Sequence, residues 1–228
     1  MNGLDDIREY LQWWRVLRQI WHDSKDFRDF LQTWKGRKSV AETPPLLSRL
    51  LIIGPGGVGK STLGRLMAGR SPDFTGDETR YLESLAIEEL QLREPNATVV
   101  IPPGQLDRRE RFWPDYDEDI RNGQFDGIIL VTSYGYHSLG ELSLSSVIAA
   151  REDETVDRQL QRYLKRCRQD ETAVAKRVAS ALSRSVQPCW LLTLVTKEDL
   201  WFDERKAVER HYRSGTYGRA LSTLLQDH

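Results

Sequence analysis

The sequence predicts an α/β fold, and two observations indicate it. From residue 46 onward, apolar runs of strand length alternate with segments whose apolar residues recur at helical spacing, in the order strand, helix, strand, strand and then repeated helix–strand units. A glycine-rich turn at residues 54–59 also joins the first strand-like run to the first helical segment. These patterns favour a sheet flanked by helices.

Composition and charge limit the classes of partner. The chain has 228 residues, of which 39% are hydrophobic, so it can bury one good core and carry a small appendage. Its 33 Lys and Arg nearly balance 34 Asp and Glu, so no nucleic-acid partner is expected. Cys167 and Cys189 are far apart in sequence, which predicts neither a disulfide framework nor a metal site.

The same composition predicts a cytoplasmic protein. No apolar run approaches the roughly 20 residues that span a bilayer. Residues 1–10 are too acidic and too interrupted for a secretory signal.

Residues 1–45 are expected to form a helical N-terminal extension and a linker. Apolar residues, with Trp14 and Trp21 among them, recur at steps of three and four over residues 4–34, and residues 36–45 contain two prolines. A Trp-rich amphipathic helix could lie on a membrane surface. We favour packing against the following domain, because acidic residues nearly cancel the basic ones in this segment.

The remaining elements are justified by apolar runs and turn residues in chain order. Residues 71–80 are polar and turn-rich, which predicts a mobile loop, and residues 106–122 form a charged segment with interspersed aromatic residues. Residues 133–154 are expected to form a loop with Tyr134, Tyr136 and His137 near its start. The expected elements are a strand at 50–53, a helix at 62–69, an antiparallel hairpin of 85–92 with 97–101, a strand at 125–132, a helix at 155–185, a strand at 190–195, and a helical segment at 200–228 broken near Gly215, Tyr217 and Gly218.

The glycine-rich turn carries the clearest chemical signal. Its residues fit the pattern G-x-x-x-x-G-K-[ST] between a strand and a helix, and they are Gly54, Pro55, Gly56, Gly57, Val58, Gly59, Lys60, Ser61 and Thr62. The glycines let successive backbone N–H groups turn toward a phosphate chain, and the helix N-terminus adds its partial positive charge. Lys60 is expected to reach the terminal phosphates, and Ser61 to ligate Mg²⁺.

Two further loops follow predicted strands. In an open α/β sheet, the ligand binds among the loops at the carboxyl ends of the strands. After residues 97–101, the N–H of Gly104 could approach a γ-phosphate, and Gln105 could orient an attacking water. After residues 190–195 comes the segment Thr196-Lys197-Glu198-Asp199. There the Asp199 carboxylate could accept two hydrogen bonds from guanine N1 and N2, while the Lys197 stem lies against the base.

Over residues 48–200 the chain resembles a small GTPase domain of the Ras and Arf type. Residues 54–61 match the first motif of that family, Gly104-Gln105 match the end of its D-x-x-G-Q motif, and Thr196 to Asp199 match its N/T-K-x-D motif. The resemblance implies that residues 46–228 form a P-loop NTPase fold with a mixed, mostly parallel sheet. It further implies that GTP or GDP with Mg²⁺ is the ligand and that Gln105, with Lys60, is catalytic.

The chain departs from the family pattern in three places. Ile101 stands where the family has the Asp that holds a magnesium-bound water. The magnesium-binding Thr of the first switch has three candidates, Thr75, Thr79 and Ser84, of which we favour Thr79 or Ser84. No apolar strand with an S-A-K-like base motif follows Asp199, so the domain is expected either to be truncated or to end differently.

These observations predict a GTP-binding molecular switch that hydrolyses GTP slowly and engages an unidentified protein effector or activator. Arg80, Arg108 and Arg109 are candidates for an arginine that approaches the γ-phosphate. A GTP-binding regulatory or assembly module without hydrolysis is the alternative that Ile101 favours. A P-loop ATPase or kinase would require the match at residues 196–199 to be accidental.

Overall fold

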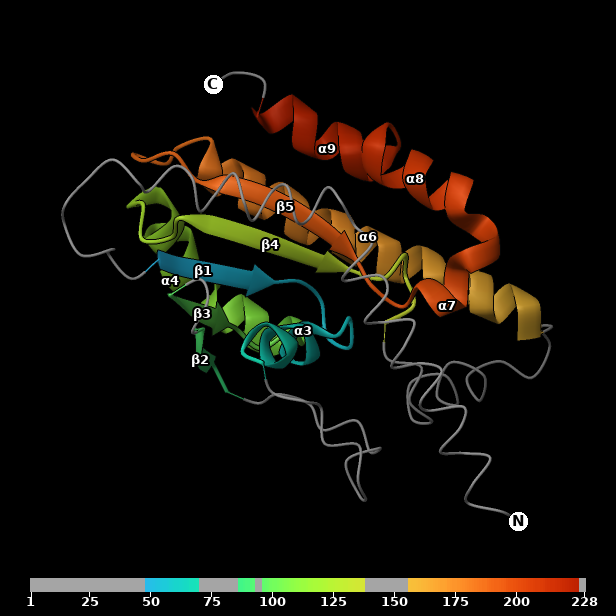
Figure 1. Ribbon diagram of the computed structural model, residues 1–228. Helices are drawn as coiled ribbons and strands as arrows, with labels where there is room; N and C mark the ends of the chain where they lie inside the picture. The colour runs from blue at the N-terminus through green and yellow to red at the C-terminus, as the bar shows by residue number, and fades with distance from the viewer. Residues whose placement is uncertain (1–47, 70–85, 93–95, 138–155, 226–228) are drawn as a thin grey trace, which may run out of the picture. The chain divides into compact units, whose positions relative to one another are not determined.

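The computed structural model describes residues 48–69, 86–92, 96–137 and 156–225 (Figure 1). The chain divides into two units between residues 46 and 47, and every described residue belongs to the second unit. The expected helical extension, its linker and the expected loop at 71–80 lie outside the described residues. The candidate metal ligands Thr75, Thr79 and Ser84 lie outside them as well.

Five strands form one mixed, mostly parallel sheet in the order β2-β3-β1-β4-β5. β1 is parallel to β3 and to β4, β4 is parallel to β5, and β2 is antiparallel to β3 (Figure 1). The expected α/β class and the expected β2–β3 pairing are therefore confirmed. The strands are β1 (Ser48–Ile53), β2 (Glu88–Leu92), β3 (Ala97–Ile101), β4 (Gly127–Thr132) and β5 (Trp190–Val195).

Helices connect the parallel strands and follow the last one. The long helix α6 lies within the expected range, and the described chain after β5 is helical through Leu225 with its break at Ser214 and Gly215. Tyr217 and Gly218, expected at that break, lie inside α9. The helical elements are α3 (Lys60–Met67), α4 (Leu106–Arg121), α6 (Val156–Leu182), α7 (Glu198–Trp201), the 3₁₀ turn η2 (Phe202–Glu204), α8 (Arg205–Arg213) and α9 (Thr216–Leu225).

The main core lies between one face of the sheet and helices α4, α6 and α9. Its members are buried side chains that alternate along the central strands and face three helices. They include Leu51, Ile53, Ile128 and Leu130 from the strands, Trp113, Tyr116 and Ile120 from α4, Val174 and Val178 from α6, and Tyr217 from α9. Helix α3 covers the opposite face, where its Gly64 lies against Ile101 and Leu90. The part of the sheet formed by β1, β2 and β3 is therefore packed against a helix on this second face.

This topology positions the candidate site. β1, β3, β4 and β5 run in the same direction, so the segments that follow them meet at one edge of the sheet. Those segments contain the glycine-rich loop (residues 54–59), Gly104-Gln105, the β4 loop (residues 133–137) and Thr196-Lys197. All of the sequence motifs within the described residues therefore lie at this edge.

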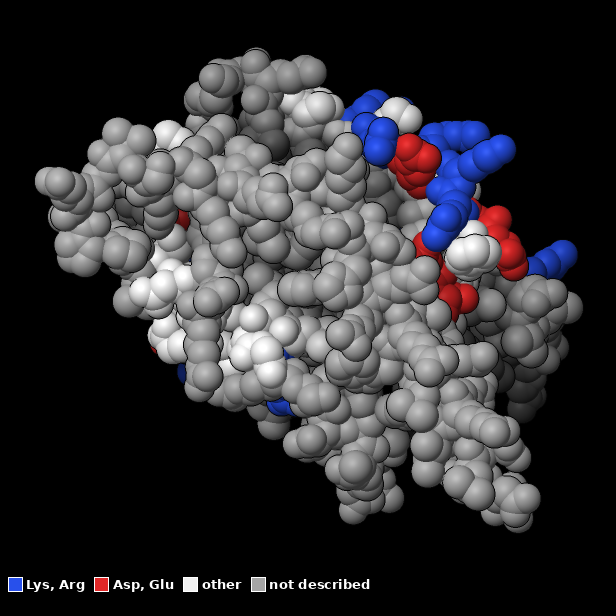
Figure 2. All heavy atoms as spheres, in the orientation of Figure 1, with Lys and Arg blue, Asp and Glu red and all other residues white. Residues whose placement is uncertain are grey.

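Charged side chains of both signs cover the helices after β5. Figure 2 shows Lys and Arg beside Asp and Glu on this side of the molecule. Arg205 pairs with Glu198, and Arg213 Nε lies 3.3 Å from Glu209 Oε1. This face therefore alternates in sign. None of the helices in the described ranges has the length and apolar character needed to cross a membrane.

Gly127 on β4 packs closely against β5, which gives a test of the β4–β5 register. Gly127 lies opposite Trp190 on β5, and a Cβ at Gly127 would overlap the Trp190 ring. We expect Gly127→Ala to lower the free energy of unfolding by roughly 1–3 kcal/mol, because a rigid ring must move. Urea titration measures the difference. Gly56→Ala is the matched control, since its nearest neighbours would lie at an ordinary 3.6 Å, and equal losses in both variants would contradict the register.

Candidate functional site

The glycine-rich loop connects β1 to α3 and is shaped by left-handed backbone. Gly57 and Gly59 have φ values of 72° and 89°, which glycine adopts without steric penalty. Gly59 is also the N-cap of α3, and a Cβ there would meet no atom within 4 Å. Gly54, Pro55 and Val58 are buried, Gly56, Gly57 and Gly59 are half-buried, and Lys60, Ser61 and Thr62 begin α3. The loop therefore places a helix N-terminus beside open space.

Lys60 is buried within this loop. Only 7% of the residue is exposed, and its Nζ donates to the Pro55 carbonyl oxygen at 2.8 Å. Burial and the nearby Arg109 guanidinium lower the pKa of Lys60 to about 7, against the opposing effect of Glu88 and Asp170. A bound anion would stabilise the charged ammonium, so the site favours an anionic ligand.

Gly104 packs directly onto the glycine-rich loop. A Cβ at Gly104 would overlap Lys60 Nζ and would lie 2.6 Å from Pro55 O and 2.7 Å from Gly56 N. Gln105 follows as the N-cap of α4. The structure thus brings Gly104 and Gln105 beside Lys60, and any larger residue at 104 would push the two loops apart.

Arg109 supports Gly104 from within the protein. Its Nη2 lies 2.6 Å from Asp170 Oδ1, and its Nη1 donates to the Gly104 carbonyl at 3.4 Å. Arg109 is 4% exposed, so the ion pair with Asp170 compensates a largely desolvated charge. Of the other two candidate arginines, Arg80 lies outside the described residues, and the Arg108 side chain is not described.

Ser61 faces a carboxylate that the sequence analysis did not select. Its Oγ donates to Glu88 Oε1 at 2.6 Å. Ile101, the residue in place of the family Asp, is 1% exposed and packs against Gly64. Within the described ranges, no three His, Cys, Asp or Glu side chains converge on a point that could hold a metal ion. A metal ion at this site would therefore be coordinated by Ser61 and by the anionic molecule that the glycine-rich loop binds.

The end of β5 is tied to the glycine-rich loop. Thr196 Oγ1 lies 2.8 Å from Val58 O and 2.9 Å from Thr132 O, and both carbonyls accept its hydrogen. Lys197 has a left-handed φ of 58° and donates from Nζ to His137 O at 2.9 Å. The third predicted residue of this motif, Asp199, is exposed in the first turn of α7. The structure therefore places Thr196, the first residue of this motif, next to the glycine-rich loop.

A buried acid, Glu171, holds the β4 loop in place. Its Oε1 accepts hydrogen bonds from Ser133 N at 2.9 Å and Gly135 N at 3.0 Å, and it lies 3.2 Å from His137 Nε2. Its Oε2 accepts from the Tyr212 hydroxyl at 2.8 Å. Glu171 is 1% exposed, so these donors replace water around a fully buried carboxylate.

Hydrogen bonds set the protonation states of His137 and Glu171. Burial opposes protonation of His137, but hydrogen bonds with Cys167 and Glu171 outweigh it and raise the pKa of His137 to about 9. Burial raises the pKa of Glu171, but its interactions with His137 and two backbone N–H groups bring it below its ordinary value. At neutral pH the two residues therefore form an ion pair beneath the carbonyl that binds Lys197.

Sequence reasoning missed Glu171, although a signal was present. The apolar stripe of α6 runs through Leu164, Cys167, Val174 and Val178, and position 171 falls on the same helical face. An acidic residue within an apolar stripe needs a buried partner. The sequence placed the nearby His137 at the start of an unassigned loop, so the pair could not be recognised.

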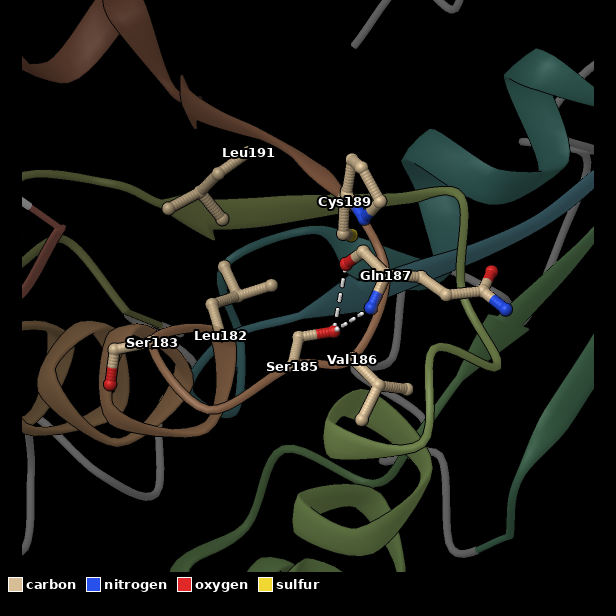
Figure 3. Close-up of a pocket in the computed structure, with 8 residues that line it drawn as sticks. Leu182, Ser183, Ser185, Val186, Gln187, Cys189 and Leu191 are labelled. Atoms are coloured by element: carbon tan, nitrogen blue, oxygen red, sulfur yellow. Dashed lines mark hydrogen bonds between the residues drawn. The ribbon is translucent and has the colours of Figure 1, made fainter. Parts of the chain in front are cut away.

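A groove at the other end of β5 does not belong to this site. It lies between the end of α6 and the start of β5 and is lined by Leu182, Ser183, Ser185, Val186, Gln187, Pro188, Cys189 and Leu191 (Figure 3). Ser185 Oγ bonds to the backbone of Gln187, which closes the turn between the two elements (Figure 3). Cys189 precedes β5 and Thr196 follows it, so the whole strand separates the groove from the glycine-rich loop.

The chain matches no protein-family model and no curated protein sequence. Its function is therefore inferred from the geometry of the site.

The ion pair of His137 and Glu171 predicts a dependence of stability on pH. Because the folded pKa of His137 lies above its ordinary 6.5, its contribution is complete below pH 6.5 and is lost as pH rises through about 9. We expect the free energy of unfolding to fall by on the order of 1–3 kcal/mol more in the wild type than in His137→Gln between pH 6.5 and 9.5.

Chemical denaturation across this pH range measures both proteins. Gln can still donate a hydrogen bond to Glu171 but carries no charge, so the comparison isolates the ion pair. Parallel pH profiles for the two proteins would show that the charge of His137 contributes nothing.

Proposed function

We propose that the chain is a GTP-binding protein with the P-loop NTPase fold of the Ras and Arf type and acts as a molecular switch with slow Mg²⁺-dependent hydrolysis. One observation carries the proposal. Three motifs that are distant in sequence meet at one edge of the sheet, with Gly104 against Lys60 and Thr196 bonded to Val58 O. An accidental match at any one motif would not require these contacts.

The glycine-rich loop fits the phosphates of GTP or GDP. The left-handed glycines and the N-terminus of α3 supply backbone N–H groups, and Lys60 supplies a buried amine. Lys60 would exchange its hydrogen bond with Pro55 O for phosphate oxygens, and its charge would then be stabilised. Ser61 offers a hydroxyl oxygen for Mg²⁺, which when bound would neutralise charge on the phosphates.

The segment after β5 fits a guanine base. The Asp199 carboxylate is exposed and could accept hydrogens from guanine N1 and N2, a pair of donors that adenine lacks. The ammonium of Lys197 is held by His137 O, which fixes the direction of a stem that could lie against the base. Thr196 joins this segment to the glycine-rich loop, so the base and the phosphates would be bound by one connected structure.

Hydrolysis is assigned to Gln105, which stands beside the γ-phosphate sensor Gly104 and would orient the attacking water. Arg109 is committed to Asp170 and the Gly104 carbonyl, so it would have to break an ion pair to reach the γ-phosphate. Turnover without a partner is therefore expected to be slow, and a protein activator would accelerate it.

A second function is a GTP-binding regulatory or assembly module that does not hydrolyse GTP. The buried position of Ile101 against Gly64 favours it, because an apolar side chain offers no oxygen to the magnesium shell. In this alternative the site binds GTP but does not hydrolyse it.

The preference for guanine is tested by Asp199→Ala. Loss of two hydrogen bonds to a charged acceptor, each contributing about 1.5–3 kcal/mol, should weaken GTP binding at least tenfold and leave ATP binding unchanged. Isothermal titration calorimetry with GTP and ATP analogues in Mg²⁺ measures both affinities. Asp203→Ala removes another exposed acid as the control. Equal affinities of the wild type for GTP and ATP would instead support a P-loop ATPase.

Gln105→Leu separates a hydrolysing switch from a binding module. We expect single-turnover GTP hydrolysis to slow at least tenfold because the attacking water is no longer oriented, with GTP affinity retained. Gln161→Leu, on the exposed face of α6, should match the wild type. Identical rates for Gln105→Leu and the wild type would remove the catalytic role. A wild type that binds GTP tightly without turnover would favour the module.

A further inference from the structure

We propose that Glu88 replaces the missing Asp of the switch motif and supports Mg²⁺ at the GTP site through the Ser61 hydroxyl and the water shell of the ion. The proposal rests on the GTP-binding function proposed above. It assigns a role to a residue on β2, a strand that carries none of the motifs of the sequence.

The position of the missing carboxylate is closed to solvent and apolar. Ile101 ends β3, is 1% exposed, and lies so close to Gly64 that a Cβ there would overlap Ile101 Cδ1. The neighbouring Leu90 Cδ1 would lie 3.0 Å from the same Cβ. This surface between α3 and the sheet is therefore filled by hydrocarbon, and no oxygen ligand comes from β3 at residue 101.

The register of β2 places a carboxylate next to that position. Glu88 is the antiparallel partner of Ile101, as Leu90 is of Val99. Residues directly opposite each other share a face of the sheet, so Glu88 points to the side that α3 covers. Its Oε1 accepts the Ser61 hydroxyl at 2.6 Å. Glu88 thus reaches the first turn of α3 from the neighbouring strand.

The chemistry of the pair suits a magnesium ion. A serine hydroxyl has one donor and two acceptor lone pairs, so donation to Glu88 leaves a lone pair of Ser61 for the metal and orients it. The second carboxylate oxygen of Glu88 can accept a hydrogen from a magnesium-bound water. Mg²⁺ keeps several waters and prefers carboxylate and phosphate oxygens, so these donors match its requirements.

Electrostatics make the role dependent on the metal. The Glu88 carboxylate lies 2.6 Å from Ser61 Oγ in the first turn of α3, next to Lys60, so its charge acts at the phosphate end of the site. Without a cation, that negative charge would repel a nucleotide triphosphate. A bound Mg²⁺ would offset both negative charges. Glu88 should therefore strengthen GTP binding when Mg²⁺ is present and weaken it when Mg²⁺ is removed.

The experiment measures the affinity of the full chain for a fluorescent, non-hydrolysable GTP analogue in Mg²⁺ and in excess EDTA. We expect Mg²⁺ to strengthen binding less in Glu88→Gln than in the wild type. The ratio of the dissociation constant in EDTA to that in Mg²⁺ should be about 10- to 100-fold lower in the variant. Glu88→Asp, which keeps the charge, should recover part of the ratio. Glu89→Gln is the matched control, because Glu89 is the next residue of β2, is exposed and faces the opposite side.

The outcomes separate this inference from the proposed function. If the wild type binds the analogue in neither condition, the GTP-binding function itself fails, and this inference fails with it. If the wild type shows the magnesium effect and Glu88→Gln keeps the same ratio, GTP binding stands and the role of Glu88 is wrong. Equal weakening of Glu88→Gln in both conditions would show that Glu88 only stabilises the fold, which also overturns the inference.

Discussion

The close approach of Gly104 to the glycine-rich loop is the constraint on which the rest of the site depends. There is no space for a Cβ at Gly104, because Lys60 Nζ and the backbone of Pro55 and Gly56 occupy its surroundings. The contact brings the start of α4 to the loop. Through Arg109 and Asp170 it also connects α6 to the same point. Two long helices are thereby positioned relative to a loop that neither of them follows in sequence.

Most of the sheet could be predicted from the sequence because its central strands are covered on both faces. Such strands must be apolar throughout, and the runs in β1 and β4 are visible without knowledge of their partners. The edge strand β5 is only half-buried, but its sequence is also mostly apolar. The sequence of helix α4 is recognisable only as a charged segment with interspersed aromatic residues. Its exposed positions are acidic and basic, and the face that enters the core is marked by Trp113, Tyr116 and Ile120, with Phe112 partly buried beside them. These apolar residues recur at helical steps only in the second half of α4, and the charged residues around them hide the period.

The motif residues of the site could be predicted because each motif is contiguous, whereas the two carboxylates that support them could not. Glu88 is 27 residues from Ser61, and Glu171 is 34 residues from His137, so their partners depend on strand register and helix packing. An isolated acidic residue usually predicts an exposed position, although Glu171 falls on the apolar face of α6. The pattern of β2 nevertheless contained a signal, since Glu88 shares the alternating face of Leu90 and Leu92, which are buried.

The carboxylate of Glu171 joins parts of the chain that would otherwise separate independently. Tyr212 of α8 donates to it, and the same hydroxyl accepts the Tyr134 N–H at 2.9 Å. If α8 moved away, the buried carboxylate of Glu171 would lose a donor and the Tyr134 N–H would lose its acceptor, and water could replace neither without entering the core. Helix α8, the β4 loop and the His137 carbonyl that holds Lys197 are therefore connected through one buried carboxylate. A force or binding partner that moves α8 would therefore also disturb the loop whose His137 carbonyl holds Lys197.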